Sequence, residues 1–372
     1  MNEEALCMKK SVLAAVFLLS ASLALSQVAP KKPEYSNYSW VIMENAKVAF
    51  DSGRYGEAMR LANTAKQNRI AEINWEVYIL EKATTPPAVR RVGDTFPDVL
   101  RILRERDEHD ALELMEKYLR LHGSGFYGNS VSRLISWLKA KTVYPEADFL
   151  IGKIYQLEGE YKLSYDFYER ARLERDYLDI PDQVYDILYA MADLAKDSNH
   201  DDDYDKALML ILDSDEDYKN AVLRRSMLRF IDADRADNVD RFFLVFRAEN
   251  KNSIRALFAL ANEEEETGFA ESALFSTSLA AVEAFTHVLT ALSERDTSYE
   301  FTTLADFFRE CGAYEDIRDW CTKNKMWDIF FEFAERAEKR GKRTFSQSLF
   351  RTMAAAVPEN YWRSRAAHRT KG

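Results

Sequence analysis

The chain has 372 residues, of which 47% are hydrophobic, so it can bury more than one compact domain usually holds; we expect two domains or one elongated repeat array. Its formal net charge of −11 repels a phosphate backbone, so nucleic acid is not expected as a partner. With 12 glycines and 8 prolines against 30% charged residues, turn residues are too few for a sandwich or barrel of short strands. The composition therefore predicts an all-α fold.

The first residues are typical of an export signal. Lys9 gives positive charge, the run 12–25 is apolar, and the small residue Ser26 stands where signal peptidase cleaves. A membrane-spanning helix needs about 20 apolar residues, more than this run has. We expect a signal peptide over 1–26, with Met8 as an alternative start, and a periplasmic or secreted protein. The alternative is an uncleaved N-terminal anchor.

Proline and charge predict how the rest of the chain is divided. Prolines at 86, 87 and 97 interrupt any helix there and indicate a linker. The last residues are basic, have no apolar period, and suggest a fraying end or, alternatively, a docking site for acidic surfaces. We expect a disordered leader over 27–37, a hairpin region over 38–83, a linker over 84–97, a longer helical array over 98–358 and a basic tail over 359–372.

Five glycines each follow one helical apolar pattern and precede another: Gly53, Gly159, Gly268, Gly312 and Gly341. A helix C-terminus often needs a left-handed residue, a conformation that costs glycine least. Seven residues before each of these stands a small residue, namely Ala46, Gly152, Ala261, Ala305 and Ala334. Small residues let two helices approach closely. The pattern predicts a series of tightly packed helical hairpins.

The segment LIGKIYQLEGEYKLSYDFYERA, residues 150–171, resembles a tetratricopeptide repeat (TPR). It has the small and aromatic residues of that family at Gly152, Tyr155, Gly159, Tyr168 and Ala171. Four further segments are similar through Ala46, Gly53 and Ala58, through Ala261, Gly268 and Ala273, through Ala305 and Gly312, and through Ala334 and Gly341. The resemblance implies an exported bacterial TPR-containing protein that folds as a right-handed superhelical solenoid of antiparallel helical hairpins.

The resemblance also implies a groove, lined mainly by the first helix of each hairpin, that binds a peptide or helix of another protein. Ten and six residues before the turn glycines are the positions expected to face it: Met43, Lys47, Phe149, Lys153, Phe258, Asn262, Asp306, Phe331 and Glu335. The alternative is that the phenylalanines pack against the preceding hairpin, since large apolar residues at helical spacing usually belong to a core.

Patterns that indicate catalysis or metal binding are scarce. The five histidines are scattered, and the chain has no HExxH, GxSxG, Walker or GxGxxG motif. Residues 197–205 place oxygen ligands at alternate positions, but the calcium loop's glycine and final carboxylate are missing, so we expect a solvated acidic loop. The glycine-rich segment 122–128 is expected to be an inter-helix loop. Cys311 and Cys321 are expected to be free, buried thiols, too far apart to form a disulfide.

These observations predict a non-catalytic protein-binding scaffold or adaptor in the bacterial cell envelope, with no metal and no cofactor. One alternative is a structural subunit of a large envelope machine, such as a motor, secretion or cell-wall complex. Another is an accessory domain of a wall-active enzyme. The acidic region 193–240 could attract a basic partner.

Overall fold

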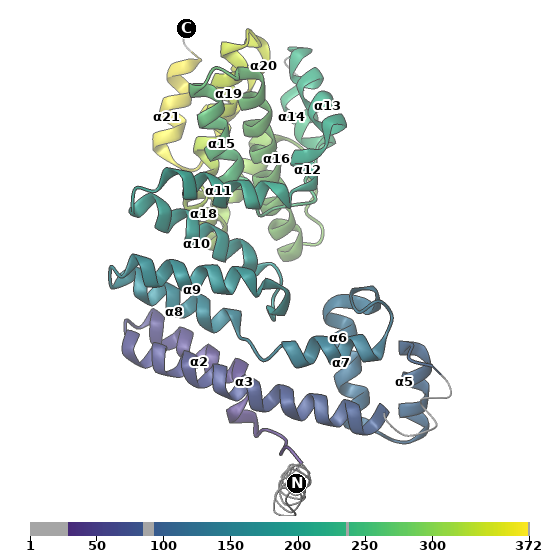
Figure 1. The fold of residues 1–372 in the computed structure, drawn as a ribbon. Coiled ribbons are helices and arrows are strands. Elements are labelled where there is room, and N and C mark those ends of the chain that lie inside the picture. Colours follow the sequence, from purple (N-terminus) through teal and green to yellow (C-terminus); the bar gives the residue numbers. More distant parts are fainter. Residues whose placement is uncertain (1–28, 85–92, 236–237, 371–372) are drawn as a thin grey trace, which may run out of the picture. The chain divides into compact units, whose positions relative to one another are not determined.

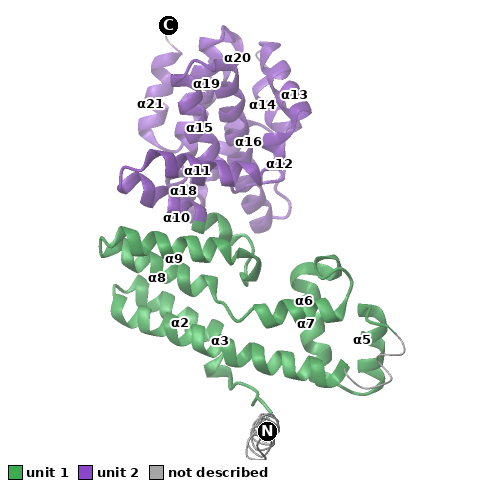
Figure 2. Cartoon of the chain, viewed as in Figure 1, with its two compact units in different colours: residues 1–187 green, residues 188–372 purple. Residues whose placement is uncertain are grey.

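The computed structural model describes residues 29–84, 93–235 and 238–370. Over these ranges the chain is helical, with no strand and a single isolated bridge between Thr95 and Ser130 (Figure 1). The predicted all-α class is confirmed. The chain divides into two compact units, residues 1–187 (unit 1) and 188–372 (unit 2), which Figure 2 distinguishes by colour.

Unit 1 contains two helical hairpins and an insertion between them. The first hairpin consists of α2 (Ser39–Asp51) and α3 (Tyr55–Thr84), and the second of α8 (Pro145–Leu157) and α9 (Tyr161–Leu173). The insertion comprises α5 (Phe96–Glu105), α6 (His109–Phe126) and α7 (Val131–Ala140). The short helices η1 (Tyr35–Asn37) and η2 (Arg175–Tyr177) flank the hairpins, and α10 (Gln183–Asp197) begins where the unit ends. The hairpins stack through α3 and α8, while α6 and α7 pack on α3.

Helix α3 is long enough to serve two cores. No glycine or proline occurs between Gly56 and Pro86, so nothing ends the helix over its 30 residues. Its first half buries Ala58 and Ala65 in a core shared with α2 and α8. Its second half buries Leu80 in a separate core with α5, α6 and α7.

Unit 2 is built around α16, which contacts α15, α19 and α13. Its helices after α10 are α11 (Asp201–Asp213), α12 (Glu216–Lys219), α13 (Ala221–Asp232), α14 (Asn238–Val245), α15 (Ile254–Glu266), α16 (Ala270–Arg295), α17 (Leu304–Ala313), α18 (Glu315–Lys323), α19 (Met326–Lys339), α20 (Arg343–Ala356) and α21 (Asn360–Arg369). In the described residues, α16 is the one helix long and apolar enough to cross a membrane, and 78% of its most apolar window is buried inside the protein.

Four of the five predicted turn glycines adopt a left-handed conformation at a helix end. Their φ values are +73° at Gly53, +79° at Gly159, +85° at Gly268 and +77° at Gly341. Gly312 departs from the prediction, because it lies inside α17 and a Cβ there would come within 2.8 Å of Pro358. The small residue paired with it, Ala305, is half-buried, whereas its counterparts Ala46, Ala261 and Ala334 are fully buried. The segment α17–α18 is therefore not a hairpin of the same kind.

The structure places the division of the chain elsewhere than the prolines suggested. The boundary falls near residue 187 rather than at 84–97, because α3 continues to Thr84 and residues 98–140 fold back onto it. In the predicted leader, Lys32 forms an ion pair with Asp110. The predicted signal peptide and residues 85–92 of the predicted linker lie outside the described residues.

The basic C-terminal segment is a helix rather than a fraying end. Helix α21 packs on α19 and α20 and buries Trp362 and Ala366. Two apolar residues at i and i+4 are enough to anchor a helix of this length when a neighbouring hairpin offers an apolar face.

Substitution of Gly152 by alanine tests the close approach of the helices in the second hairpin. A Cβ at this position would meet the ring of Tyr168 at 2.6 Å, so we expect Gly152→Ala to destabilise unit 1 by about 1–3 kcal/mol. Urea unfolding measures the loss. Gly56→Ala is the matched control, because a Cβ there meets no atom within 4 Å and alanine favours the helix. An equal loss in both variants would contradict the tight contact.

Candidate functional site

In unit 1, the residues predicted to face a groove divide into two buried and two accessible ones. Met43 is 2% exposed and belongs to the core, and Phe149 is 8% exposed with its ring 5.6 Å from that of Tyr168. Lys47 forms an ion pair with Glu44 of its own helix at 2.7 Å. The structure therefore leaves the lysines, and not the large apolar residues, available to a partner.

The ammonium of Lys153 lies over two aromatic rings. It is 4.9 Å from the ring centre of Phe50 and 5.6 Å from that of Phe149. A cation held over aromatic faces keeps its charge while its stem covers apolar surface. This contact joins the first helices of the two hairpins, since Phe50 is on α2 and Lys153 on α8.

In unit 2, helix α21 covers two of the predicted groove residues. Phe331 is 1% exposed, with Trp362 at 5.5 Å between ring centres and the guanidinium of Arg365 at 4.3 Å. Glu335 lies 3.8 Å from Arg369 of the same helix. Phe331 is therefore buried, but by the helix that follows and by α20 of its own hairpin, and not by a preceding hairpin.

Two of the three remaining predicted residues of unit 2, Asn262 and Asp306, form hydrogen bonds within the protein. Asn262 accepts a hydrogen bond from the buried Arg336 at 2.7 Å. Asp306 accepts a hydrogen bond from the hydroxyl of Thr303 at 2.7 Å and donates its own backbone N–H to that hydroxyl, so the pair caps α17. Phe258 is half-buried. The structure does not bring the unit 2 set together on one surface.

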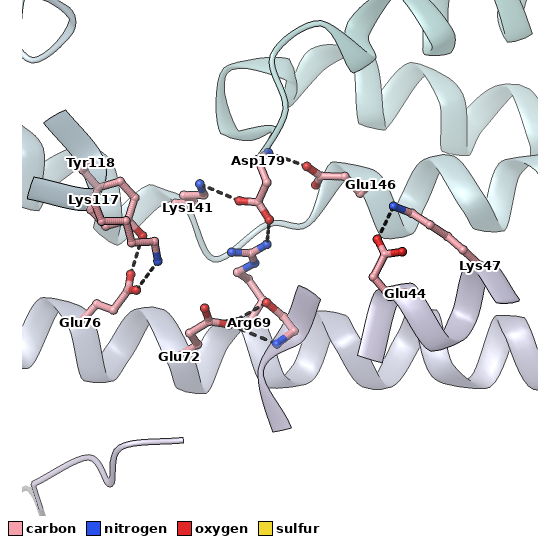
Figure 3. Close-up of polar contacts among 11 residues, drawn as sticks. Glu44, Lys47, Arg69, Glu72, Glu76, Lys117, Tyr118, Lys141, Glu146 and Asp179 are labelled. Atoms are coloured by element: carbon pink, nitrogen blue, oxygen red, sulfur yellow. Dashed lines mark hydrogen bonds and ion pairs between the residues drawn. The ribbon is translucent and has the colours of Figure 1, made fainter. Parts of the chain in front are cut away.

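A buried glutamate on α3 closes the open end of the first hairpin (Figure 3). Glu72 is 2% exposed, and its Oε2 accepts the backbone N–H of Ser39 at 3.2 Å and the Ser39 hydroxyl at 2.6 Å. The first N–H groups of a helix have no partner within the helix. The carboxylate therefore supplies the acceptor that α2 lacks at its start, and its charge favours the helix N-terminus.

Unit 2 has the same arrangement. Glu283, in the middle of α16, is fully buried, and its Oε2 accepts the backbone N–H of Ser253 at 3.1 Å. Ser253 is the N-cap residue of α15, the first helix of that hairpin. In both units, a glutamate on the long second helix thus holds the beginning of the first helix.

An ionic centre lies beside the first closure in unit 1. Arg69 of α3 and Lys141, which follows α7, both bond the carboxylate of Asp179, Lys141 at 2.9 Å (Figure 3). Both cations are almost fully buried. Burial alone would raise the pKa of Asp179, but the charges of Arg69 and Lys141 lower it to about 2. Asp179 therefore stays ionised and ties the chain after η2 to α3.

Glu146, at the start of α8, faces the same centre with less support. Its Oε1 accepts the backbone N–H of Asp179, whereas its Oε2 is buried without a hydrogen-bond partner. Burial, and then the negative charge of Asp179, raise the pKa of Glu146 to about 7. This carboxyl changes charge near neutral pH.

The second half of α3 carries another buried carboxylate. Glu76 accepts hydrogen bonds from the ammonium of Lys117 at 2.8 Å and from the hydroxyl of Tyr118 (Figure 3). Burial, and then the charge of Glu76, raise the pKa of Tyr118 well above its usual value. These bonds fix α6 on α3.

Two segments with residue types common in ligand sites, 122–128 and 197–205, are largely helical. Helix α6 continues to Phe126, interrupted only at Gly123, so the segment 122–128 is not simply a loop. The aspartates from Asp201 form the first turn of α11, where carboxylates favour the helix N-terminus. Over 29–84, 93–235 and 238–370, no group of three or more His, Cys, Asp or Glu residues is placed to hold a metal ion.

The two cysteines of unit 2 are free and buried. Burial, and then a hydrogen bond that the Cys311 thiol donates to Cys321, raise the pKa of Cys311 well above its usual value. The thiols are thus closer than expected. A protonated, buried thiol is a poor nucleophile.

The contacts of Glu72 with Ser39 and of Glu283 with Ser253 were not predicted from the sequence. One of the two glutamates nevertheless stands out in the sequence. Glu283 is the only Asp, Glu, Lys or Arg between residues 272 and 293, in the one described helix that is long and apolar enough to cross a membrane. A lone carboxylate in such a helix must find a partner when buried. Glu72 has no comparable signal, because α3 is rich in charged residues.

No family model matches the chain. An uncharacterized protein of Treponema pallidum (strain Nichols) is 29% identical over 334 residues, which cover 89% of this chain and 89% of that protein. The similarity therefore extends through both units and carries no function with it.

Removal of the Arg69 guanidinium tests the ionic centre. We expect Arg69→Met to destabilise unit 1 by about 1.5–3 kcal/mol, because it removes a charge-assisted hydrogen bond to the half-buried Asp179 and leaves this carboxylate with Lys141. Arg101→Met is the matched control: it breaks the exposed pair with Glu105 and should cost less than about 1 kcal/mol. Thermal unfolding measures both. Similar losses would show that Arg69 contributes no more than a surface charge.

The pKa of Glu146 predicts a pH dependence of unit 1. Because the folded pKa of about 7 lies above the unfolded value of 4.5, the stabilising contribution of Glu146 is complete below about pH 4.5 and is lost as the pH rises to about 7. Glu146→Gln keeps an acceptor for the Asp179 N–H and should abolish this decline. Urea unfolding at a series of pH values checks it, and an unchanged decline in the variant would contradict the assignment.

Proposed function

We propose that the chain is a non-catalytic protein-binding scaffold built from TPR-like hairpins. One observation carries the proposal: in each unit two hairpins, each turned by a left-handed glycine, stack through the second helix of one and the first helix of the next, α3 on α8 and α16 on α19. Stacked hairpins of this kind are a common support for extended binding surfaces. We further propose that the hairpins follow a right-handed superhelical path.

The exposed side of α2, the first helix of unit 1, is the surface that we propose binds a partner. Helix α2 exposes Trp40, Glu44 and Val48 at successive i+4 positions, the tryptophan by 45% and the valine by 58%. Lys47 and Lys153 lie on the first helices of the two stacked hairpins. Apolar side chains beside charged ones on rigid helices suit recognition of an amphipathic peptide or helix.

The proposed place of action is the bacterial envelope, in the periplasm or outside the cell. The apolar run 12–25 and the preceding lysines support export. We propose that the protein is an adaptor that joins components of an envelope assembly. Its buried carboxylates have structural roles, and one side of α2 is partly exposed.

Site-specific photo-crosslinking in intact cells tests the proposal. A benzoylphenylalanine at Val48 should capture a defined protein, because this residue is 58% exposed on the proposed binding face. The matched control is the same group at Leu173, which is 64% exposed on a second helix. We expect Lys47→Glu to weaken capture at Val48 with little change of the melting temperature, because the ion pair of Lys47 with Glu44 is largely exposed.

Equal products at Val48 and Leu173, or none at Val48, would contradict binding at this face. Retention of full capture in Lys47→Glu would separate the lysine from the interaction.

A further inference from the structure

Two carboxyl groups meet in the interior of unit 2. Asp215 and Glu283 are both fully buried. Asp215 caps α12 through Oδ1, which accepts the N–H groups of Asp217 at 2.9 Å and Tyr218 at 3.1 Å. Glu283 uses Oε2 for the N–H of Ser253. In each carboxyl, therefore, one oxygen accepts hydrogen bonds from backbone N–H groups and the other accepts none.

The two remaining oxygens, Asp215 Oδ2 and Glu283 Oε1, are buried without a donor. Two ionised carboxylates are both acceptors, so they cannot hydrogen-bond each other, and their charges repel in a site that excludes water. A single proton between the side chains turns this contact into a hydrogen bond and satisfies both oxygens. Burial, followed by the charge and hydrogen bond of Asp215, raises the pKa of Glu283 well above its usual value.

We propose that Asp215 and Glu283 share one proton. The resulting hydrogen bond between a carboxylic acid and a carboxylate is a pH-sensitive contact that holds α12 and the start of α15 on the middle of α16. The pair joins three elements that are distant in sequence. Loss of its proton leaves two negative charges in the interior and loosens α12 and the segment 246–253.

The surrounding groups do not neutralise a second charge. Asp217 of α12 adds a negative charge, and its Oδ2 accepts the N–H of Glu249 at 2.8 Å. Tyr189 of α10 donates its hydroxyl to the carbonyl of Asn252 at 2.6 Å, with the guanidinium of Arg255 on its ring. None of the ion pairs formed by the described residues involves Asp215 or Glu283. Lys251 on the adjoining segment reaches Thr290 of α16 instead.

The sign of the effect follows from the raised pKa of Glu283. Its contribution to stability is complete below the unfolded value of 4.5 and declines as the pH rises through the folded pKa. Unit 1 provides an internal comparison, because Glu72 closes its hairpin with the Ser39 N–H and hydroxyl and has no carboxyl bonded to it.

Hydrogen exchange on the full chain tests the proposal. Protection factors of the amides of Asp217, Tyr218 and Glu249, corrected for the intrinsic pH effect, are measured between about pH 6 and pH 9. We expect them to fall in the wild type by up to about tenfold per pH unit in the range where the pair ionises. In Glu283→Gln they should be nearly independent of pH, because the amide donates to Asp215 and still accepts from Ser253.

Glu72→Gln is the matched control and should retain the wild-type pH dependence at these three amides. Carboxyl infrared spectra give a second readout: because Glu146 is also partly protonated near pH 7, the difference spectrum of the wild type minus Glu283→Gln should show the band of one protonated carboxyl. Asp215→Asn replaces Glu283→Gln if that variant fails to fold.

A wild type without pH dependence at these amides, or the same dependence in Glu283→Gln, would overturn the proposal. So would the absence of the protonated carboxyl.

Discussion

The structure of each unit depends on a buried glutamate, one of whose carboxyl oxygens accepts the N–H of a serine at the start of the preceding helix. A hairpin turned by glycine is fixed at one end only, and the other end leaves helix N–H groups without acceptors. Glu72 and Glu283 supply that acceptor inside the protein, where an unsatisfied N–H costs about 1–3 kcal/mol. Because the bond joins residues about 30 positions apart, it sets how the two helices lie along their whole length.

The two units share a plan that this bond makes possible. A short first helix, a left-handed glycine and a long second helix are followed by inserted helices and then by another glycine-turned hairpin. In each unit the glutamate–serine hydrogen bond fixes the long helix well beyond the turn. This matters because the second part of that helix packs against the inserted helices. The insertions differ, α5 to α7 in unit 1 and α17 to α18 in unit 2, and so do the neighbours of the glutamates. Unit 1 places an Arg69–Asp179 pair beside its closure, whereas unit 2 places a second carboxyl there.

Local sequence rules predicted the all-α class and the turns, since a glycine after an apolar helix pattern needs only its own backbone preference to end the helix. The same rule failed at Gly312, because a glycine accepted for close packing against Pro358 leaves a similar pattern in the sequence. The accessibility of the predicted site could not be predicted in this way. Whether Phe331 faces a partner or a core depends on α21, whose anchoring residues Trp362 and Ala366 are too few to show a period. The carboxyl pair in unit 2 joins residues far apart in the chain, so only the fold reveals it.

Amide exchange at Ser39 and Ser253 is the most direct test of the shared plan. An N–H at the start of a helix normally exchanges with solvent quickly, since no carbonyl of the helix accepts it. At about pH 6, both serine amides should be protected as strongly as the centres of α3 and α16, because each donates to a buried glutamate. Exchange at the rate of an open helix end at both positions would contradict it.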